Sequence, residues 1–191
     1  MNILTIDTAT DFELISVTAA GKTYEFAEDV KMSHSVTMFD SVKRILDEAS
    51  ISIKDVSLIG VGVGPGSFTG VRIAVSTARM IAQILNIPLT GVITQDIFAA
   101  SAPCEDGEKV LVAFDAKKSR VFGALYACGQ PLSMEKIIEA GDYSMEYMLK
   151  SLNSGDKLLC IGDGCSRYSD VISTYSASTG FSFRIMDNFK P

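Results

Sequence analysis

Apolar and polar positions alternate over the first thirty residues and then change to helical spacing. The apolar run in NILTID (residues 2–7) predicts a buried strand. The alternation that follows predicts a hairpin of residues 12–19 and 22–28. Apolar residues then recur at steps of three and four, which indicates an amphipathic helix over 34–49. The chain is therefore expected to begin with a three-stranded meander followed by a helix.

A glycine-rich loop lies between the next predicted strand and the next predicted helix. The apolar run at about 57–63 predicts a buried strand, and a helix is expected from about Thr69 to Asn86. Pro88 ends this helix, because proline lacks the backbone N–H that a helix interior needs, and a strand begins there and extends to about residue 93. A short helix at about 94–101 completes the first half of the chain.

The polar segment APCEDGE (residues 102–108) separates the two halves, and a β-pattern restarts after it. The stretches KVLVAFDA and VFGALYA predict a second hairpin with its turn at KKSR. Each half thus opens with a hairpin and continues into helices and strands, so we expect an α/β fold with one lobe of residues 1–103 and a smaller lobe of residues 104–191. The second lobe is expected to contain a helix at about 142–152, a strand at KLLCIG, a helix near 166–176 and a final strand at FSFRI.

Composition and charge restrict the function classes. The 191-residue chain is 47% hydrophobic and 21% charged, which is typical of a folded globular protein. Its formal net charge of −6 argues against binding of RNA or DNA by this chain alone, because that affinity depends mainly on Lys and Arg neutralising phosphates. His34 is the single histidine, so HExxH zinc sites and histidine-rich metal clusters are excluded. His34 opens a predicted helix, either as a catalytic base or metal ligand, or as a capping or interface residue.

The N-terminal residues and the cysteines predict a cytoplasmic location. The start MNILTIDTAT has no basic region, which is untypical of a signal peptide, and no apolar run reaches the roughly 18 residues of a membrane span. The cysteines form no CxxC pair, and we expect them to be reduced thiols. Cys160 and Cys165 can face each other near a loop, where a metal or redox role is the alternative to plain thiols.

The glycine-rich stretch GVGVGPGSFTG (residues 60–70) fits neither common phosphate-binding pattern. A Walker A loop requires a lysine, and none lies between Lys54 and Lys109; a GxGxxG fingerprint requires a third glycine that is never in register. The stretch therefore predicts a tight turn capped by Ser67, although the free N–H groups of residues 67–70 can also receive an anion.

The helix after this turn is apolar on most sides, so we expect it to be covered on more than one face. Its own sheet covers one face, and the other is covered by helix 34–49, by another subunit or by both. Ala78 belongs to a stripe of small residues suited to close approach, and Arg72 to a narrow polar stripe. We therefore expect either Arg72→Glu or Ala78→Trp to abolish pairing and leave the fold intact.

Other residues are weaker candidates for chemistry. Asp7, Thr8 and Thr10 end the first predicted strand, where they form either a phosphate-binding hairpin or an ordinary turn with side-chain hydrogen bonds. Asp115 lies at a strand end before the KKSR turn, as either a catalytic carboxylate or part of a solvated hairpin. A peptidase would have to pair His34 with a nearby serine hydroxyl, Ser35 or Ser67.

The stretch GVGVGPGSFTGVRIAV resembles the signature of the TsaB family, also called YeaZ, and residues 64–73 match its G-P-G-S-F-T-G-[LV]-R-I pattern throughout. ILTIDTAT, His34-Ser35, Asp115-Ala116 and the GDG at 162–164 agree in order with weaker motifs of the family. The resemblance implies a two-lobed actin-like ATPase (ASKHA, ribonuclease H-like) fold with a reduced second lobe.

The resemblance also implies a role in making threonylcarbamoyladenosine in tRNA, at the adenosine beside the anticodon. The chain would be a non-catalytic subunit, without a catalytic residue or metal site of its own, that binds and activates a TsaD-like transferase. A TsaE-like ATPase subunit would join the assembly, ATP and metal would bind the partner subunits, tRNA would be contacted only through the complex, and the chain alone would be a homodimer. The implied pairing surface comprises His34, Met38, Phe39, Ser67, Phe68, Thr69, Arg72, Ile73, Ser76 and Met80.

The sequence departs from the family pattern at two candidate phosphate sites. The usual D-T-S is Asp7-Thr8-Ala9, which removes a hydroxyl, and the usual D-A-R is Asp115-Ala116-Lys117, which loses the bidentate fork of arginine. These changes weaken nucleotide binding through Asp7, Thr8, Thr10 and Asp115. The alternative hypothesis is a small ATP-binding enzyme of actin-like fold, and tight nucleotide binding by the isolated chain would favour it.

Overall fold

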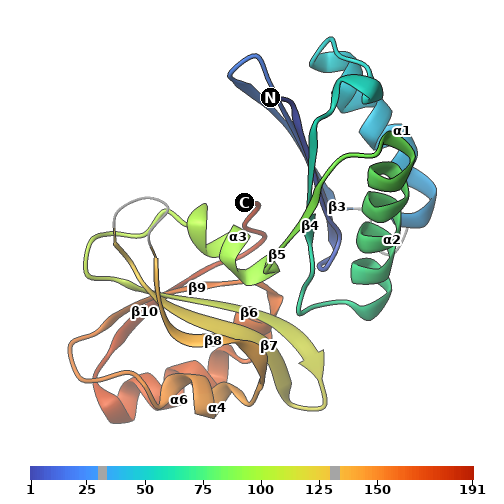
Figure 1. The fold of residues 1–191 in the computed structure, drawn as a ribbon. Coiled ribbons are helices and arrows are strands. Elements are labelled where there is room, and N and C mark those ends of the chain that lie inside the picture. The colour runs from blue at the N-terminus through green and yellow to red at the C-terminus, as the bar shows by residue number, and fades with distance from the viewer. Residues whose placement is uncertain (30–33, 130–133) are drawn as a thin grey trace. The chain divides into compact units, whose positions relative to one another are not determined.

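The chain folds into two compact units, Met1–Thr94 and Gln95–Pro191. The computed structural model describes residues 1–29, 34–129 and 134–191, and of residues 34–37 it describes the backbone alone. Each unit is built on one five-stranded sheet with its helices (Figure 1).

The first sheet begins with the predicted three-stranded meander. β1 (Ile3–Asp7) pairs antiparallel with β2 (Phe12–Ala19), which pairs antiparallel with β3 (Lys22–Asp29). On its other side β1 pairs parallel with β4 (Leu58–Gly62), and β4 pairs parallel with β5 (Leu89–Val92). The strand order is β3-β2-β1-β4-β5.

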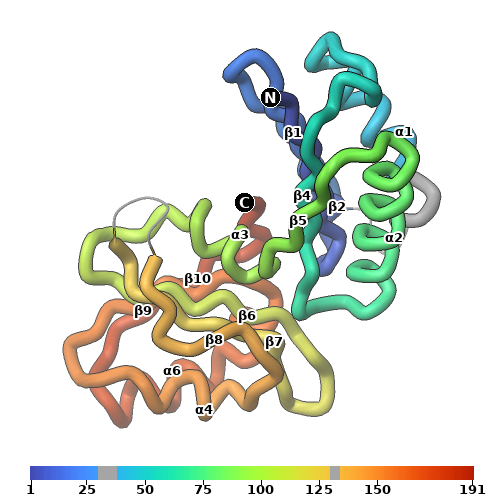
Figure 2. Tube along the Cα trace, viewed as in Figure 1, coloured from blue at the N-terminus to red at the C-terminus, as the bar shows by residue number. Residues whose placement is uncertain are grey.

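Two helices cover one face of this sheet and lie side by side (Figures 1 and 2). α1 (His34–Glu48) and α2 (Phe68–Leu85) begin and end close to the predicted residues, and the short helix η1 (Ile53–Asp55) precedes β4. The Ser67 hydroxyl accepts a hydrogen bond from Gly70 N at 3.3 Å, which caps α2 as predicted. The core contains Leu4, Ile6, Ile15, Val17 and Ile59 of the sheet and Met38, Val42, Ile45, Ala74, Ala78 and Ile81 of the helices.

The second sheet repeats the order of the first. β6 (Lys109–Lys117), β7 (Arg120–Ala127) and β8 (Glu135–Tyr143) form an antiparallel meander. β9 (Lys157–Ile161) pairs parallel with β6, and β10 (Ser182–Met186) pairs parallel with β9, in the order β10-β9-β6-β7-β8. The same order and pairing in both sheets support the prediction of two related α/β lobes.

Strand β8 was not predicted, and the predicted helices of the second half differ in their bounds. β8 is an edge strand that carries many charged residues, so its apolar alternation is weak. Its last residues take up the start of the helix expected at 142–152, which is α4 (Met145–Leu149), capped by Ser144. The helix expected near 166–176 is instead a pair, α5 (Asp163–Arg167) and α6 (Ser169–Thr179).

The boundary between the units lies between Thr94 and Gln95, not at the predicted 103/104, so the second unit is not the smaller one that the sequence predicted. The helix α3 (Thr94–Ala100) explains the difference, because its side chains pack on the second sheet. The ring of Phe98 lies edge-on to Phe114 of β6, with centroids 5.0 Å apart. The Tyr126 hydroxyl of β7 donates a hydrogen bond to Asp96 at 2.7 Å.

The cysteines form one disulfide and one pair of free thiols. Cys104 is bonded to Cys128, so the prediction of reduced thiols was wrong for these two. Cys160 and Cys165 are free and buried, and the Cys165 thiol donates to the Ile161 carbonyl at 3.4 Å. Burial and then the contact with Cys160 raise the pKa of the Cys165 thiol.

Candidate protein interface

The glycine-rich loop packs directly on the turn between β1 and β2. Ser67 N donates a hydrogen bond to the Ala9 carbonyl at 2.7 Å. A Cβ at Gly66 would overlap that same carbonyl oxygen, and one at Gly70 would overlap the carbonyl oxygen of Thr8. These two positions require glycine because the two backbones approach so closely. The loop is therefore part of the packing of the first unit, as the tight-turn interpretation predicted.

The predicted phosphate hairpin uses its polar groups inside the first unit. The Asp7 carboxylate is buried, and it accepts hydrogen bonds from Ala9 N and from the Thr94 hydroxyl, both at 2.7 Å. The buried Thr8 hydroxyl donates to the Gly70 carbonyl at 2.7 Å. The Thr10 hydroxyl accepts a bond from a backbone N–H two residues later. These bonds hold the turn against the start of α2, which favours the ordinary-turn alternative.

Asp115 of the second unit is likewise engaged with its neighbours. Its side chain is only 2% exposed, and Lys117 Nζ lies 2.9 Å from its carboxylate. The Tyr168 hydroxyl donates to it at 3.2 Å, and Arg167 Nε lies at 3.4 Å. Burial would raise the pKa of Asp115, but the hydrogen bonds from Lys117 and the two cations outweigh burial, so the pKa lies below its ordinary value. The carboxylate is therefore held ionised by this chain's own residues.

One side of α2 presents large apolar side chains to solvent. Phe68 is 74% exposed, Ile84 75% and Met80 43%. The Arg72 guanidinium lies over the Phe68 ring, 5.3 Å from its centroid. We call this exposed side the α2 face, and it consists of Phe68, Thr69, Arg72, Ser76, Arg79, Met80, Gln83 and Ile84.

The opposite side of α2 is packed inside the first unit. Ala74 and Ala78 are fully buried and Ala82 nearly so. Burial of Ala78 therefore argues against the prediction that Ala78→Trp leaves the fold intact, because this stripe of alanines packs against the unit's own core. The sequence showed the stripe of alanines but not which element it faces.

The other predicted interface residues divide into exposed and buried ones. Phe39 of α1 is 55% exposed, whereas the adjacent Met38 is 1% exposed and belongs to the core, which corrects its assignment to the surface. Ile73 is partly buried against the same core. Ser67 is exposed and caps α2, and the His34 side chain lies outside the described part of the chain.

Sequence reasoning left Ile84 out of the predicted surface. Ile84 lies one turn beyond Met80 on the same side of the helix, and this spacing was the available signal. Ile84 is 75% exposed in the last turn of α2, which ends at Leu85 with Asn86 in the left-handed conformation.

The described part of the chain contains neither a metal-binding cluster nor a membrane-spanning helix. Over residues 1–29, 34–129 and 134–191, no three His, Cys, Asp or Glu side chains lie grouped as a metal ion would need. None of the helices in these ranges combines the length and the apolar character needed to cross a membrane.

Comparison with known proteins gives consistent results. A family model described as "TsaD: tRNA N6-adenosine threonylcarbamoyltransferase" matches residues 27–156. The Buchnera aphidicola (subsp. Schizaphis graminum) protein named "tRNA threonylcarbamoyladenosine biosynthesis protein TsaB" is 31% identical, over 85% of this chain and 78% of that protein. The Bacillus subtilis protein of the same name is 30% identical, over 82% of this chain and 68% of that protein.

A solved structure agrees with the fold. YeaZ from Pseudomonas aeruginosa superposes with a TM-score of 0.78 at 28% identity, covering 88% of this chain and 78% of the other. With the repeated strand order of the two sheets, this likeness confirms the predicted actin-like α/β fold. The sequence relatives, the family model and the fold agree, and the chain belongs to the TsaB (YeaZ) family of tRNA threonylcarbamoyladenosine biosynthesis proteins.

Proposed function

We propose that this chain is a non-catalytic subunit that binds and activates a TsaD-like transferase. The complex would form threonylcarbamoyladenosine in tRNA, at the adenosine beside the anticodon, in the cytoplasm. The observation that carries the proposal is the α2 face, where Phe68 and Ile84 remain about three-quarters exposed. Large apolar side chains gathered on one face of a helix are typical of a surface that a partner covers.

The positive charges of the α2 face would orient a bound partner as well as add to its affinity. Arg72 and Arg79 lie between the apolar side chains, and both are exposed. A partner with carboxylates opposite these guanidinium groups would gain charge-assisted hydrogen bonds and orientation. Phe39 of the neighbouring α1 is a further exposed aromatic side chain of the same unit. The same face would pair two copies of this chain when the transferase subunit is absent.

The proposal places the chemistry on other subunits. Asp7, Thr8 and Asp115 are engaged by residues of this chain, which disfavours the second candidate, a small ATP-binding enzyme. ATP and metal would bind the TsaD-like and TsaE-like subunits. Because the net charge is −6, tRNA would be contacted through the complex and not by this chain alone.

Light scattering on a sizing column tests the proposal, with the chain alone and mixed with the TsaD-like subunit of the same organism. We expect a homodimer alone and a one-to-one complex in the mixture, with Arg72→Glu forming neither. Threonylcarbamoyladenosine synthesis by the mixture should fall with the complex. The proposal would be overturned if the chain is a monomer alone and does not bind the transferase subunit. Nucleotide binding by that monomer would favour the second candidate.

A further inference from the structure

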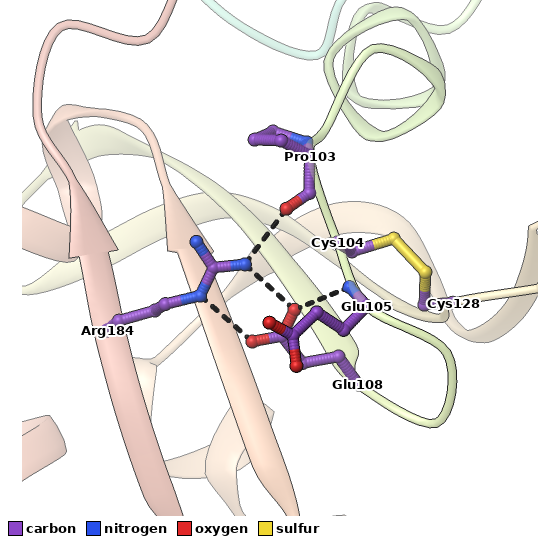
Figure 3. The surroundings of a disulfide bond; sticks show 6 residues. All are labelled: Pro103, Cys104, Glu105, Glu108, Cys128 and Arg184. Atoms are coloured by element: carbon purple, nitrogen blue, oxygen red, sulfur yellow. Dashed lines mark hydrogen bonds and ion pairs between the residues drawn. A yellow bond between two sulfur atoms is a disulfide. The ribbon is translucent and has the colours of Figure 1, made fainter.

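The segment between α3 and β6 is fastened to the second unit on two sides (Figure 3). On one side Cys104 is bonded to Cys128, the residue that follows β7. On the other side Arg184 of β10 donates from Nη2 to the Pro103 carbonyl at 2.9 Å. Arg184 also pairs its Nε and Nη2 with the Glu108 carboxylate, at 3.0 and 2.9 Å. The disulfide and the arginine thus hold the same short segment.

The disulfide lies beyond the end of the sheet that it borders. The ladder between β6 and β7 runs from the pair Lys109–Ala127 to the hairpin turn, and one more hydrogen bond joins Cys128 N to the Glu108 carbonyl. The strands are held by this ladder and by buried side chains such as Val110. The disulfide is therefore expected to restrain mainly residues 103–108, which lie outside the β6–β7 ladder.

The two cysteine pairs differ in access. Cys160 and Cys165 are 0% exposed, so a thiol reagent cannot reach either sulfur in the folded chain. Cys104 and Cys128 are only partly buried. Thiol–disulfide exchange requires a thiolate to reach a sulfur atom of the bond. Of the four cysteines, these two alone have solvent-exposed surface, so we expect exchange without unfolding at this pair only.

We propose that Cys104 and Cys128 are a reversible redox pair that controls how firmly residues 103–108 are held. A dithiol reductant would attack one sulfur as a thiolate, form a mixed disulfide and release the other cysteine as a thiol. Its second thiol would then displace the remaining cysteine. Two electrons and two protons pass from the reductant to the pair, and the reductant leaves as a disulfide. An exchangeable disulfide oxidant reverses the reaction.

Reduction would alter one wall of a pocket on the same sheet. The pocket has a volume of about 220 Å³, and its lining includes Glu105, Glu108 and Arg184. Glu105 N donates to the Glu108 carboxylate at 2.9 Å, so movement of the segment would disturb the partners of that carboxylate. With the disulfide open, the restraints that remain on the segment include Arg184, this local bond and the bond from Cys128 N to the Glu108 carbonyl.

The test uses the full chain, equilibrated in glutathione buffers of graded ratio and in excess dithiothreitol. Alkylation under native conditions, counted by mass spectrometry, should label two cysteines after reduction and leave Cys160 and Cys165 unlabelled. Amide hydrogen exchange of residues 104–108 should become at least about tenfold faster, whereas residues 110–114 of β6 serve as an internal control. The melting temperature should fall by about 5 °C or more.

Cys104→Ser is the matched variant, and it should show the faster exchange in oxidising and reducing buffers alike. Cys128→Ser should reproduce it from the other side of the bond. The inference is overturned if the pair is reduced only after denaturation, if no disulfide forms at any glutathione ratio, or if exchange at 104–108 is the same in both states.

Discussion

Phe68→Ala tests whether the α2 face is a pairing surface. Burial of a phenylalanine side chain is favourable by about 1.5–3 kcal/mol relative to full exposure. Phe68 is 74% exposed, so pairing can still recover about 1–2 kcal/mol of this free energy. A cavity left in a packed interface adds to the loss. We therefore expect pairing to weaken by about 2 kcal/mol, which is about a 30-fold rise in Kd for the TsaD-like subunit.

Isothermal titration calorimetry with that subunit measures this change. The melting temperature of Phe68→Ala should stay within about 2 °C of the parent chain, because the side chain contributes little to the unit's own core. Tyr147→Ala is the control, since Tyr147 is a 51% exposed aromatic residue of the second unit. A Kd for Phe68→Ala within about threefold of the parent value would refute the assignment of this face to pairing.

The remaining predictions concern stability. Gly70→Ala should lower the free energy of unfolding in urea by about 2–3 kcal/mol, because its Cβ would overlap a backbone carbonyl. Gly21→Ala has open space around the new Cβ and should cost only about 1–2 kcal/mol, for its positive φ. Equal losses for the two variants would contradict this reasoning. Ala78→Trp should cost at least about 3 kcal/mol, and a folded variant by circular dichroism would show that the core yields. The Arg184 hydrogen bond lowers the pKa of Glu108 below its ordinary value of 4.5. The ionised Glu108 therefore contributes its full stabilisation of the fold above that ordinary value, and the contribution is lost as pH falls through the folded-state pKa. Glu108→Gln should therefore show a shallower loss of stability in acid, and an unchanged slope would argue against this ion pair.

Local patterns were enough to predict most of the first unit. Alternation of apolar and polar residues predicted β2 and β3, and apolar residues at steps of three and four predicted α1, because such strands and helices each turn one apolar face toward the core. The contiguous Gly64–Ile73 motif indicated the family, and two of its glycines, Gly66 and Gly70, lie in close backbone contacts. The edge strand β8 was not predicted, because its many charged residues leave only a weak alternation of apolar and polar positions.

By itself, then, the sequence determined the order of most elements, the α/β class and the family, since each depends on neighbouring residues or on a contiguous motif. Only the tertiary structure decided which side of α2 is buried, and it placed Ala78 in the core and Phe68 in solvent. It also brought Cys104 to Cys128 and Arg184 to Glu108, pairs separated by 24 and 76 residues. Such pairs leave no local periodicity, because the sheet order that brings them together is set by long-range strand pairing.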